Sequence, residues 1–81
     1  MTGSTRLFVS FPESVVRKPL LYEIVRRFDV APNIRRADVE EHTGWIICEL
    51  AGSAESREAA VAYLEDEGCT VNRMEGDVLA G

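Results

Sequence analysis

Pro19 to Ile34, with the sequence PLLYEIVRRFDVAPNI, decides the fold of this chain. Proline suits the first turn of a helix, where its missing N–H is not needed. Apolar residues then recur at the spacing of one helix face: Leu20, Leu21, Ile24, Val25 and Phe28. Arg26 and Arg27 fall in the last turn, where positive charge suits the helix dipole. The stretch predicts an amphipathic helix over residues 20–28 and a link that leads to Asn33-Ile34.

The sequence predicts strands on both sides of this helix. Residues 6–11 (Arg-Leu-Phe-Val-Ser-Phe) are rich in β-forming side chains, and Pro12 ends the run. After the link, a polar and weakly patterned strand is expected from about residue 33 to residue 41. His42-Thr43-Gly44 has the composition of a hairpin turn. The apolar run over residues 45–51 is therefore expected to form the next strand.

The second half of the chain predicts one more helix and one more strand. Ser53 is a suitable helix N-cap and Gly68 a suitable C-terminal stop, so we expect a helix from about residue 54 to residue 67. Its inward-facing residues are expected to be Ala60, Val61 and Leu64. Residues 69–74 then form the last strand, and residues 76–81 are expected to be a flexible tail.

The predicted order of elements is βαββαβ, which belongs to the α+β class. Right-handed crossovers place both helices on one face of a four-stranded antiparallel sheet and leave the other face without a helix. We expect a single domain over residues 1–81, with its core over about residues 6–75.

The strand over residues 45–51 is apolar on both faces near its start. Ile46, Cys48 and Leu50 are expected to face the helices, while Trp45 and Ile47 face the open side of the sheet. A solvated face usually carries polar residues at such positions. Something is therefore expected to cover Trp45 and Ile47, either a second subunit or a ligand. The alternative is an ordinary scattered apolar surface.

Size and charge limit the classes of function. A chain of 81 residues buries only about 60% of its unfolded surface, which favours a dimer or attachment to a larger partner. Its 46% apolar and 28% charged residues are typical of a globular protein. The net charge of −5 argues against nucleic acid as a partner. We find neither a signal peptide nor an apolar run of membrane-spanning length, so we expect a cytoplasmic protein without membrane insertion.

The residues that usually carry chemistry do not form a reactive set. Cys48 and Cys69 lack the CxxC spacing of zinc and iron–sulfur sites, and we expect them to be buried free thiols in preference to a disulfide. His42 lies in a turn, away from any candidate nucleophile. Gly44 and Gly52 belong to no phosphate-binding motif. We therefore expect no enzyme, no metal and no cofactor.

Asn33 is the polar residue that most directly indicates binding. Its amide has two donors and an acceptor, so it can hold the ammonium or the carboxylate group of an amino acid. The alternative is a turn or cap residue after Pro32, since asparagine favours such positions.

The chain resembles the NIL domain family from Arg6 to Glu75. The family takes its name from an Asn-Ile-Leu tripeptide, and the matching stretches are Lys18-Pro19-Leu20-Leu21, Phe28-Asp29-Val30, Asn33-Ile34, Thr43-Gly44-Trp45 and Ala62-Tyr63-Leu64 to Gly68-Cys69-Thr70-Val71. The resemblance implies a ferredoxin-like fold, similar to that of ACT domains, which agrees with the βαββαβ order.

The resemblance also implies a function. In better-known relatives this domain is the C-terminal part of the ATP-binding subunit of bacterial methionine importers, where it pairs with its copy, binds methionine and restrains transport. Other relatives carry it beside ferredoxin-type iron–sulfur domains. By this resemblance Asn33 would be the polar contact for the ligand, and Ile34 would help to line the pocket.

The chain departs from the family in two ways. Arg35 replaces the leucine of the motif, which either adds a partner for a carboxylate or marks a lost ligand site. The chain also has no ATPase module and no ferredoxin cysteines, so it is either a free-standing domain or a fragment, and Met1 and the terminal Gly81 favour a complete small protein.

Two hypotheses about function follow. The first is a regulatory domain that senses L-methionine or a related sulfur amino acid as a homodimer. Its ligand-binding residues would be Asn33, Ile34 and Arg35, and Trp45 and Ile47 would form an interface or a pocket wall. The second is an interaction module without a ligand, whose open sheet face docks a transporter, redox or sulfur-metabolism protein.

Overall fold

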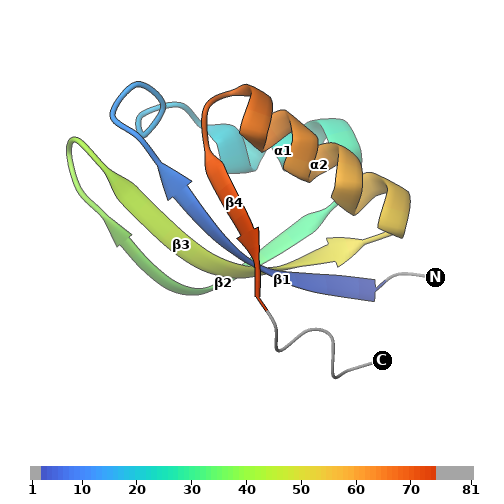
Figure 1. The fold of residues 1–81 in the computed structure, drawn as a ribbon. Coiled ribbons are helices and arrows are strands. Elements are labelled where there is room, and N and C mark those ends of the chain that lie inside the picture. The colour runs from blue at the N-terminus through green and yellow to red at the C-terminus, as the bar shows by residue number, and fades with distance from the viewer. Residues whose placement is uncertain (1–2, 75–81) are drawn as a thin grey trace.

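Six elements follow one another in the predicted order. The computed structural model describes residues 3–74, in which two helices lie on one face of a four-stranded sheet (Figure 1). The elements are β1 (Gly3–Phe11), α1 (Leu20–Phe28), β2 (Ala31–Val39), β3 (Gly44–Gly52), α2 (Ala54–Asp66) and β4 (Thr70–Arg73). The predicted α+β, ferredoxin-like fold is confirmed. The predicted tail, residues 76–81, lies outside the described residues.

The sheet is antiparallel and has the strand order β2-β3-β1-β4. β1 and β3 form its centre and pair over their whole lengths, from Gly3 opposite Gly52 to Phe11 opposite Gly44. β2 and β4 form the two edges, with nine and four residues. Both helices come from β-α-β crossovers, which is why they share one face of the sheet (Figure 1).

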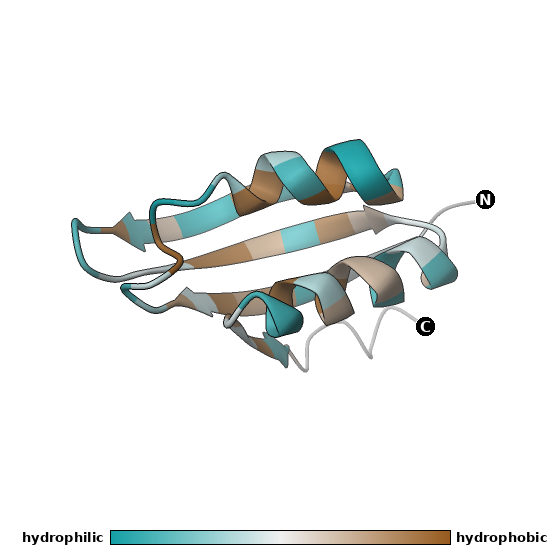
Figure 2. Cartoon of the chain, turned by 90° about the horizontal axis from the view of Figure 1, so that it is seen from above, coloured by the Kyte–Doolittle hydropathy of each residue, from teal (hydrophilic) through white to brown (hydrophobic). Residues whose placement is uncertain are grey.

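The core lies between the helices and the inner face of the sheet. Alternate residues of β3 are buried because successive strand side chains point to opposite faces. The helices turn their apolar sides toward the same layer (Figure 2). The core residues are Leu7, Val9, Phe11, Val15, Leu20, Ile24, Val30, Ile46, Cys48, Leu50, Ala60, Val61, Leu64 and Cys69. The predicted inward faces of the strand at residues 45–51 and of the second helix are thereby confirmed.

The apolar stripe of α1 is narrower than the sequence predicts. Leu20 and Ile24 are buried, and Leu21 and Phe28 pack partly buried against the core. Val25 was expected on the same stripe, but 45% of its surface is exposed. At about 100° per residue, Val25 lies on the flank of α1 that is turned away from the core centre. That flank borders the site described below.

The ends of both helices follow from local chemistry. The N–H of Glu23 donates to the carbonyl of Pro19 at 3.1 Å, so the proline precedes the first helical residue. The predicted cap of α2 is confirmed, because the Ser53 hydroxyl accepts a hydrogen bond from the N–H of Ser56 at 3.0 Å. α2 ends one residue earlier than predicted, and Gly68 follows with a φ of +112°, which glycine adopts most easily.

The predicted boundaries of the strands need correction. β2 covers residues 31–39 and not 33–41, because Pro32 is tolerated in an edge strand whose outer side needs no N–H donor. The hairpin closes where the N–H of Glu40 donates to the carbonyl of Thr43 at 2.7 Å, so the turn lies before Gly44, which already belongs to β3. β1 begins earlier than predicted, and β4 is shorter.

A β-bulge interrupts the pairing of β2 with β3. Ile34 lies opposite Cys48 and Arg36 lies opposite Ile47, so Arg35 is the extra residue on β2. One extra residue reverses the alternation of faces along the rest of the strand. Before the bulge odd-numbered residues face the open side of the sheet, and after it even-numbered residues do.

Candidate functional site

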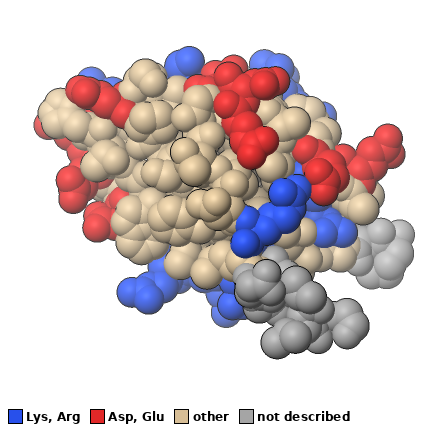
Figure 3. Space-filling view, viewed as in Figure 1, with Lys and Arg blue, Asp and Glu red and all other residues tan. Residues whose placement is uncertain are grey.

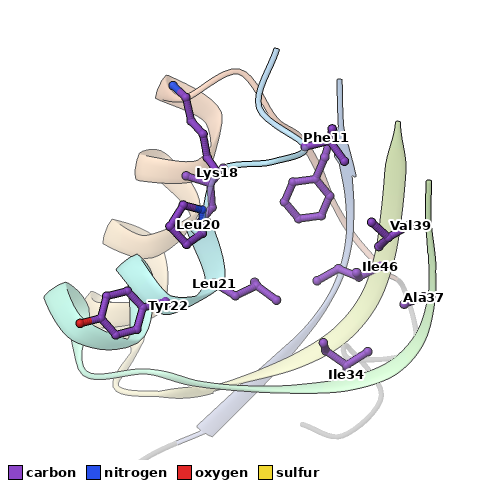
Figure 4. A pocket seen from close by; sticks show the side chains of 11 residues that line it. Phe11, Lys18, Leu20, Leu21, Tyr22, Ile34, Ala37, Val39 and Ile46 are labelled. Atoms are coloured by element: carbon purple, nitrogen blue, oxygen red, sulfur yellow. The ribbon is translucent and has the colours of Figure 1, made fainter. Parts of the chain in front are cut away.

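An apolar groove lies between α1 and the inner side of β2. Its volume is about 260 Å³. Helix α1, the segment before it, the central strands and β2 all contribute to its walls, as Figure 4 shows. The lining residues are Phe11, Val16, Lys18, Pro19, Leu20, Leu21, Tyr22, Ile34, Ala37, Val39 and Ile46.

The groove exists because the helices do not cover the edge of the sheet. Arg27 lies over the ring of Tyr63, with its guanidinium carbon 5.2 Å from the ring centre, so this flank of α1 meets α2. The opposite flank, with Leu21 and Tyr22, overhangs β2. On the sheet side of the groove, Ile34 and Val39 of β2 point toward this flank (Figure 4). An apolar strip on an edge strand therefore remains only partly covered.

Exposed apolar surface gathers around this groove. In the described part of the chain, the large apolar side chains that count as exposed are Tyr22 at 61%, Val39 at 61%, Ile34 at 48% and Val25 at 45%. Three of these four line the groove, and Val25 lies one helical turn beyond Leu21 on the same flank. A contiguous apolar patch of this kind usually marks a binding surface.

Ion pairs join the segments at the end of the groove. The segment before α1 meets the β2–β3 hairpin through an ion pair at 3.2 Å between Arg17 Nη2 and Glu41 Oε2 and through a hydrogen bond at 2.8 Å between His42 Nδ1 and Glu13 Oε2. Lys18, whose ammonium reaches Glu67 at 3.4 Å, is the cationic residue in the groove lining. The groove is therefore apolar along its walls and charged at its rim.

The structure separates the two residues of the Asn-Ile pair. Ile34 lines the groove, whereas Asn33 lies opposite Glu49 on the open face of the sheet. Neighbouring residues of a strand point to opposite faces, so one pocket within a single chain cannot receive both side chains.

Arg35 also lies on the open face. Its Nη1 is 3.8 Å from Glu49 Oε1, and Arg6 Nη2 donates to Glu49 Oε2 at 2.6 Å. The hydrogen bond from Arg6 lowers the pKa of Glu49, and the charge of Arg35 lowers it further. The arginine that replaces the leucine of the motif therefore has a carboxylate partner within the chain.

The open face carries an aromatic pair. The rings of Phe8 and Trp45 stack with their centres 5.6 Å apart and their planes 28° apart, and Ile47 is partly buried beside them. The predicted position of Trp45 and Ile47 on the open face is confirmed by the burial pattern of β3. Phe8, which the sequence analysis did not single out, covers part of Trp45. The structure thus brings Asn33 and Arg35 to the same face as Trp45, with Ile34 on the other face.

Sequence reasoning placed several of the lining residues in the core or the site but did not predict the groove. Tyr22 and Val39 had no place in the predicted core or site, although an aromatic residue outside the helix stripe was a usable signal. Ala37 gave no signal at all. The groove depends on how far α1 reaches over the sheet, which no local pattern determines.

The two thiols occupy the core. Cys48 and Cys69 are free and buried, as predicted, and burial raises the pKa of each to about 11. Thiolates are the reactive form of cysteine, so both groups are poor nucleophiles at neutral pH. Within residues 3–74 no cluster of three or more His, Cys, Asp or Glu side chains could hold a metal ion, and no helix is long and apolar enough to cross a membrane.

The surface charges are mixed. In the view of Figure 3, acidic and basic side chains border a broad uncharged area, and basic groups do not form a continuous band. A nucleic-acid backbone needs a continuous basic surface, which this face does not offer.

Comparison with known proteins gives the family. The NIL domain profile matches residues 5–73. The chain belongs to the NIL domain family, in agreement with the resemblance seen in its sequence. No curated protein sequence matches the chain closely enough to count as a relative.

A solved structure shows the same fold. The C-terminal domain of an ABC transporter ATP-binding protein from Enterococcus faecalis superimposes with a TM-score of 0.78 at 16% sequence identity. The match covers 88% of this chain and 83% of that one. At this identity the likeness establishes a shared fold.

Proposed function

We propose that this chain is a regulatory domain that binds L-methionine or a closely related sulfur amino acid in the groove beside β2. The observation that carries the proposal is the groove itself, an apolar space of about 260 Å³ next to the Asn-Ile pair of the family motif. Ligand sites are mostly apolar with a few polar anchors, and those for drug-sized molecules have about 300–1,000 Å³, so a groove of this volume suits a smaller ligand. A single amino acid is a ligand of suitable size.

The thioether would lie against Ile34 and Leu21, which face each other across the groove. The charged ends of the amino acid need polar partners. The outer edge of β2 supplies unpaired N–H and C=O groups at alternate residues, and Lys18 supplies a cation at the rim. We keep Asn33 as the polar contact, through a side-chain amide that a second subunit would supply to the groove, and Arg35 as a neighbouring charge on the open face.

The regulatory role rests on family membership and on the fold shared with the C-terminal domain of an ATP-binding protein. We propose that the chain acts in the cytoplasm as a homodimer and, by attachment or docking, on the ATP-binding subunit of a transporter. Methionine would act by favouring one arrangement of the dimer, because a ligand shifts an equilibrium only through its different affinities for two states. The proposed activity is binding, without turnover.

Isothermal titration with L-methionine tests the ligand. Saturating methionine at about 100 times its dissociation constant should add about 2.7 kcal/mol of stability, a shift of several degrees in Tm. Ile34→Asp places a charge in the groove at an exposed position and should weaken binding at least about tenfold. Ile34→Leu is the matched control and should bind nearly as the wild type. Equal affinity of both variants would show that the ligand does not use the groove.

Asn33→Ala tests whether the side-chain amide of Asn33 touches the ligand. If it does not, affinity should change less than about threefold. A loss of affinity in Asn33→Ala equal to that in Ile34→Asp would assign the contact to the amide side chain, supplied across a subunit interface.

A second candidate function is supported by the open face of the sheet. The stacked Phe8 and Trp45 rings, with Ile47 beside them, are an apolar surface without a helix over it. This face would dock a transporter, redox or sulfur-metabolism protein. Trp45→Lys should then abolish partner binding without affecting methionine affinity, whereas Ile34→Asp should do the reverse.

A further inference from the structure

The lining of the groove beside β2 is charged with one sign. Among the described residues that line it, Lys18 is the charged one, and none carries a carboxylate. The hydroxyl of Tyr22 can donate or accept a hydrogen bond, so it favours neither sign of charge on a ligand. The groove therefore offers a ligand a positive side-chain partner within its own walls and no negative one.

Carboxylates near the end of the groove are engaged with other side chains. Glu41 Oε2 lies 3.2 Å from Arg17 Nη2, and Glu13 Oε2 lies 2.8 Å from His42 Nδ1. Both acids stand outside the lining. A ligand ammonium that sought these acids would leave the apolar walls and compete with a partner already in place. The end of the groove thus does not make good the lack of an acid in its lining.

Lys18 is able to change its partner. Its Nζ lies 3.4 Å from Glu67 Oε1, and the two side chains are 53% and 31% exposed. The lysine side chain extends from the groove toward the end of α2 (Figure 4). A solvated ion pair of this kind contributes little free energy, and the four-carbon stem of lysine is flexible. Rotation of the side chain brings its ammonium over the groove without any movement of the main chain.

Charge then decides which relative of methionine suits the groove. Methionine brings an ammonium and a carboxylate, and both lose water on binding. A charged group that is desolvated without an opposite charge weakens binding. The carboxylate finds Lys18, whereas the ammonium finds neutral acceptors. The 2-oxo acid of methionine has the same thioether chain and the same carboxylate, with an oxo group in place of the ammonium.

We propose that the groove selects thioether carboxylates without a free ammonium group, of which the 2-oxo acid of methionine is the simplest, over methionine itself. Lys18 leaves Glu67 and pairs with the ligand carboxylate. The thioether lies between Ile34 and Leu21, as in the proposed function. The inference rests on the proposed function for this site and narrows its ligand by charge.

The other polar groups at the site do not reverse this preference. The outer edge of β2 has N–H donors and C=O acceptors in alternation, so it serves either sign. The amide of Asn33, supplied by a second subunit, donates to an oxo group as well as it accepts from an ammonium. The net charge of −5 acts over long distances, where salt screens it. Contact with Lys18 is the short-range term that remains.

A series of three ligands with one shape and different charge tests the selection. The 2-oxo acid of methionine is an anion at pH 7, L-methionine is a zwitterion, and L-methioninol is a cation, and all three carry the same thioether chain. In isothermal titration we expect the 2-oxo acid to bind at least about tenfold more tightly than methionine. Methioninol should bind most weakly.

Variants of Lys18 assign the preference to its charge. Lys18→Met removes the ammonium and keeps a long apolar side chain, so the 2-oxo acid should lose at least about tenfold in affinity. The affinity for methioninol should not fall. Lys18→Arg is the matched control, because it keeps the positive charge, and it should retain the order of the three ligands. Circular dichroism checks that both variants keep the fold.

Glu67→Gln tests the exchange of partners. It removes the internal competitor for Lys18, so the affinity for the 2-oxo acid should rise about two- to fivefold. The same substitution in the Lys18→Met chain should have no effect, since the two residues act through each other. An unchanged affinity in Glu67→Gln alone would overturn the exchange.

The remaining outcomes separate this inference from the proposed function. Methionine that binds as tightly as its 2-oxo acid, or more tightly, would overturn the selection by charge and leave the proposed function standing. A chain that binds none of the three ligands would overturn both. Ile34→Asp should weaken all three, and equal affinities in that variant and the wild type would remove the groove as the site of either proposal.

Discussion

Glu49 holds two of the three arginines on the open face of the sheet. It accepts a hydrogen bond from Arg6 across the β1–β3 pair, and Arg35 approaches it from β2. Arg36, beyond the bulge, lies opposite Ile47 and takes no part in this cluster of ion pairs. A carboxylate on a central strand thus takes up the arginine that replaced the apolar residue of the motif, and Arg35 need not enter the groove.

The pKa of Glu49 gives a pH prediction. The hydrogen bond from Arg6 lowers this pKa below its ordinary value of 4.5 in the folded chain. Near this pH the folded chain therefore binds fewer protons than the unfolded chain. The contribution of Glu49 to stability is present above pH 4.5 and is lost as the pH falls through the lowered pKa. Glu49→Gln should flatten this part of the stability curve, measured by urea unfolding between about pH 3 and pH 6.

Arg6→Gln is the complementary variant. It removes the first cause of the lowered pKa, so its stability should have a similarly shallow pH dependence. The double variant should be little less stable than either single variant, because both substitutions remove the same interaction. Full additivity would mean that the two residues do not act through each other.

At the same scale, the sequence predicted the residues of the site better than their arrangement. Asn33 and Ile34 follow each other in the motif, and the two-residue period of a strand is enough to separate their side chains. The bulge at Arg35 could not be predicted, because it depends on the register of β2 against β3. The positions of Trp45 and Ile47 were predictable, since β3 alternates without interruption.

At the scale of the elements, caps and stops decide where each helix begins and ends. Ser53→Ala removes the hydroxyl that accepts from the N–H of Ser56, and it should lower the free energy of unfolding by about 1 kcal/mol. In a domain of this size that corresponds to a Tm decrease of about 4–8 °C, measured by calorimetry.

Ser53→Asp serves as the control for the cap. An aspartate at this position also accepts from the exposed N–H groups and suits the positive end of the helix dipole, so its Tm should stay close to that of the wild type. A decrease equal to that of alanine would mean that the hydroxyl contributes through something other than capping.

The order and type of all six elements could be predicted, because their signals are local. Pro19, Ser53 and Gly68 mark helix ends by their own chemistry. Strand ends were harder to predict. β2 starts two residues before the predicted position because pairing with Ala51 and Leu50 carries it through Pro32, and pairing is a property of two strands.

At the scale of the whole molecule, stability depends on one small core. Leu50 is fully buried between the helices and the sheet, and Leu50→Ala should cost about 2–5 kcal/mol. A single core of this size supplies only a few kcal/mol of net stability, so a large part of the variant should be unfolded at 25 °C. Urea unfolding followed by the fluorescence of Trp45 measures this loss.

The two thiols provide an independent measurement of the same loss. Cys48 and Cys69 are buried with a pKa of about 11, so a thiol reagent should label them only when the core opens. Labelling should be slow in the wild type and rapid in Leu50→Ala. Leu50→Met preserves volume, and its labelling rate should remain close to that of the wild type. Fast labelling of the wild type at high stability would instead indicate local opening.

The unequal lengths of the edge strands limit how far association can proceed. β2 has nine residues, whereas β4 has four and follows directly after α2. If β2 joined β4 of the next molecule, every molecule would keep one open edge, and subunits would add without end as a filament. A homodimer in which β2 paired with itself would instead use both long edges in one step and leave only the short strands outside. Such a homodimer would remain a particle of fixed size, even at concentrations where other open sheets form fibres.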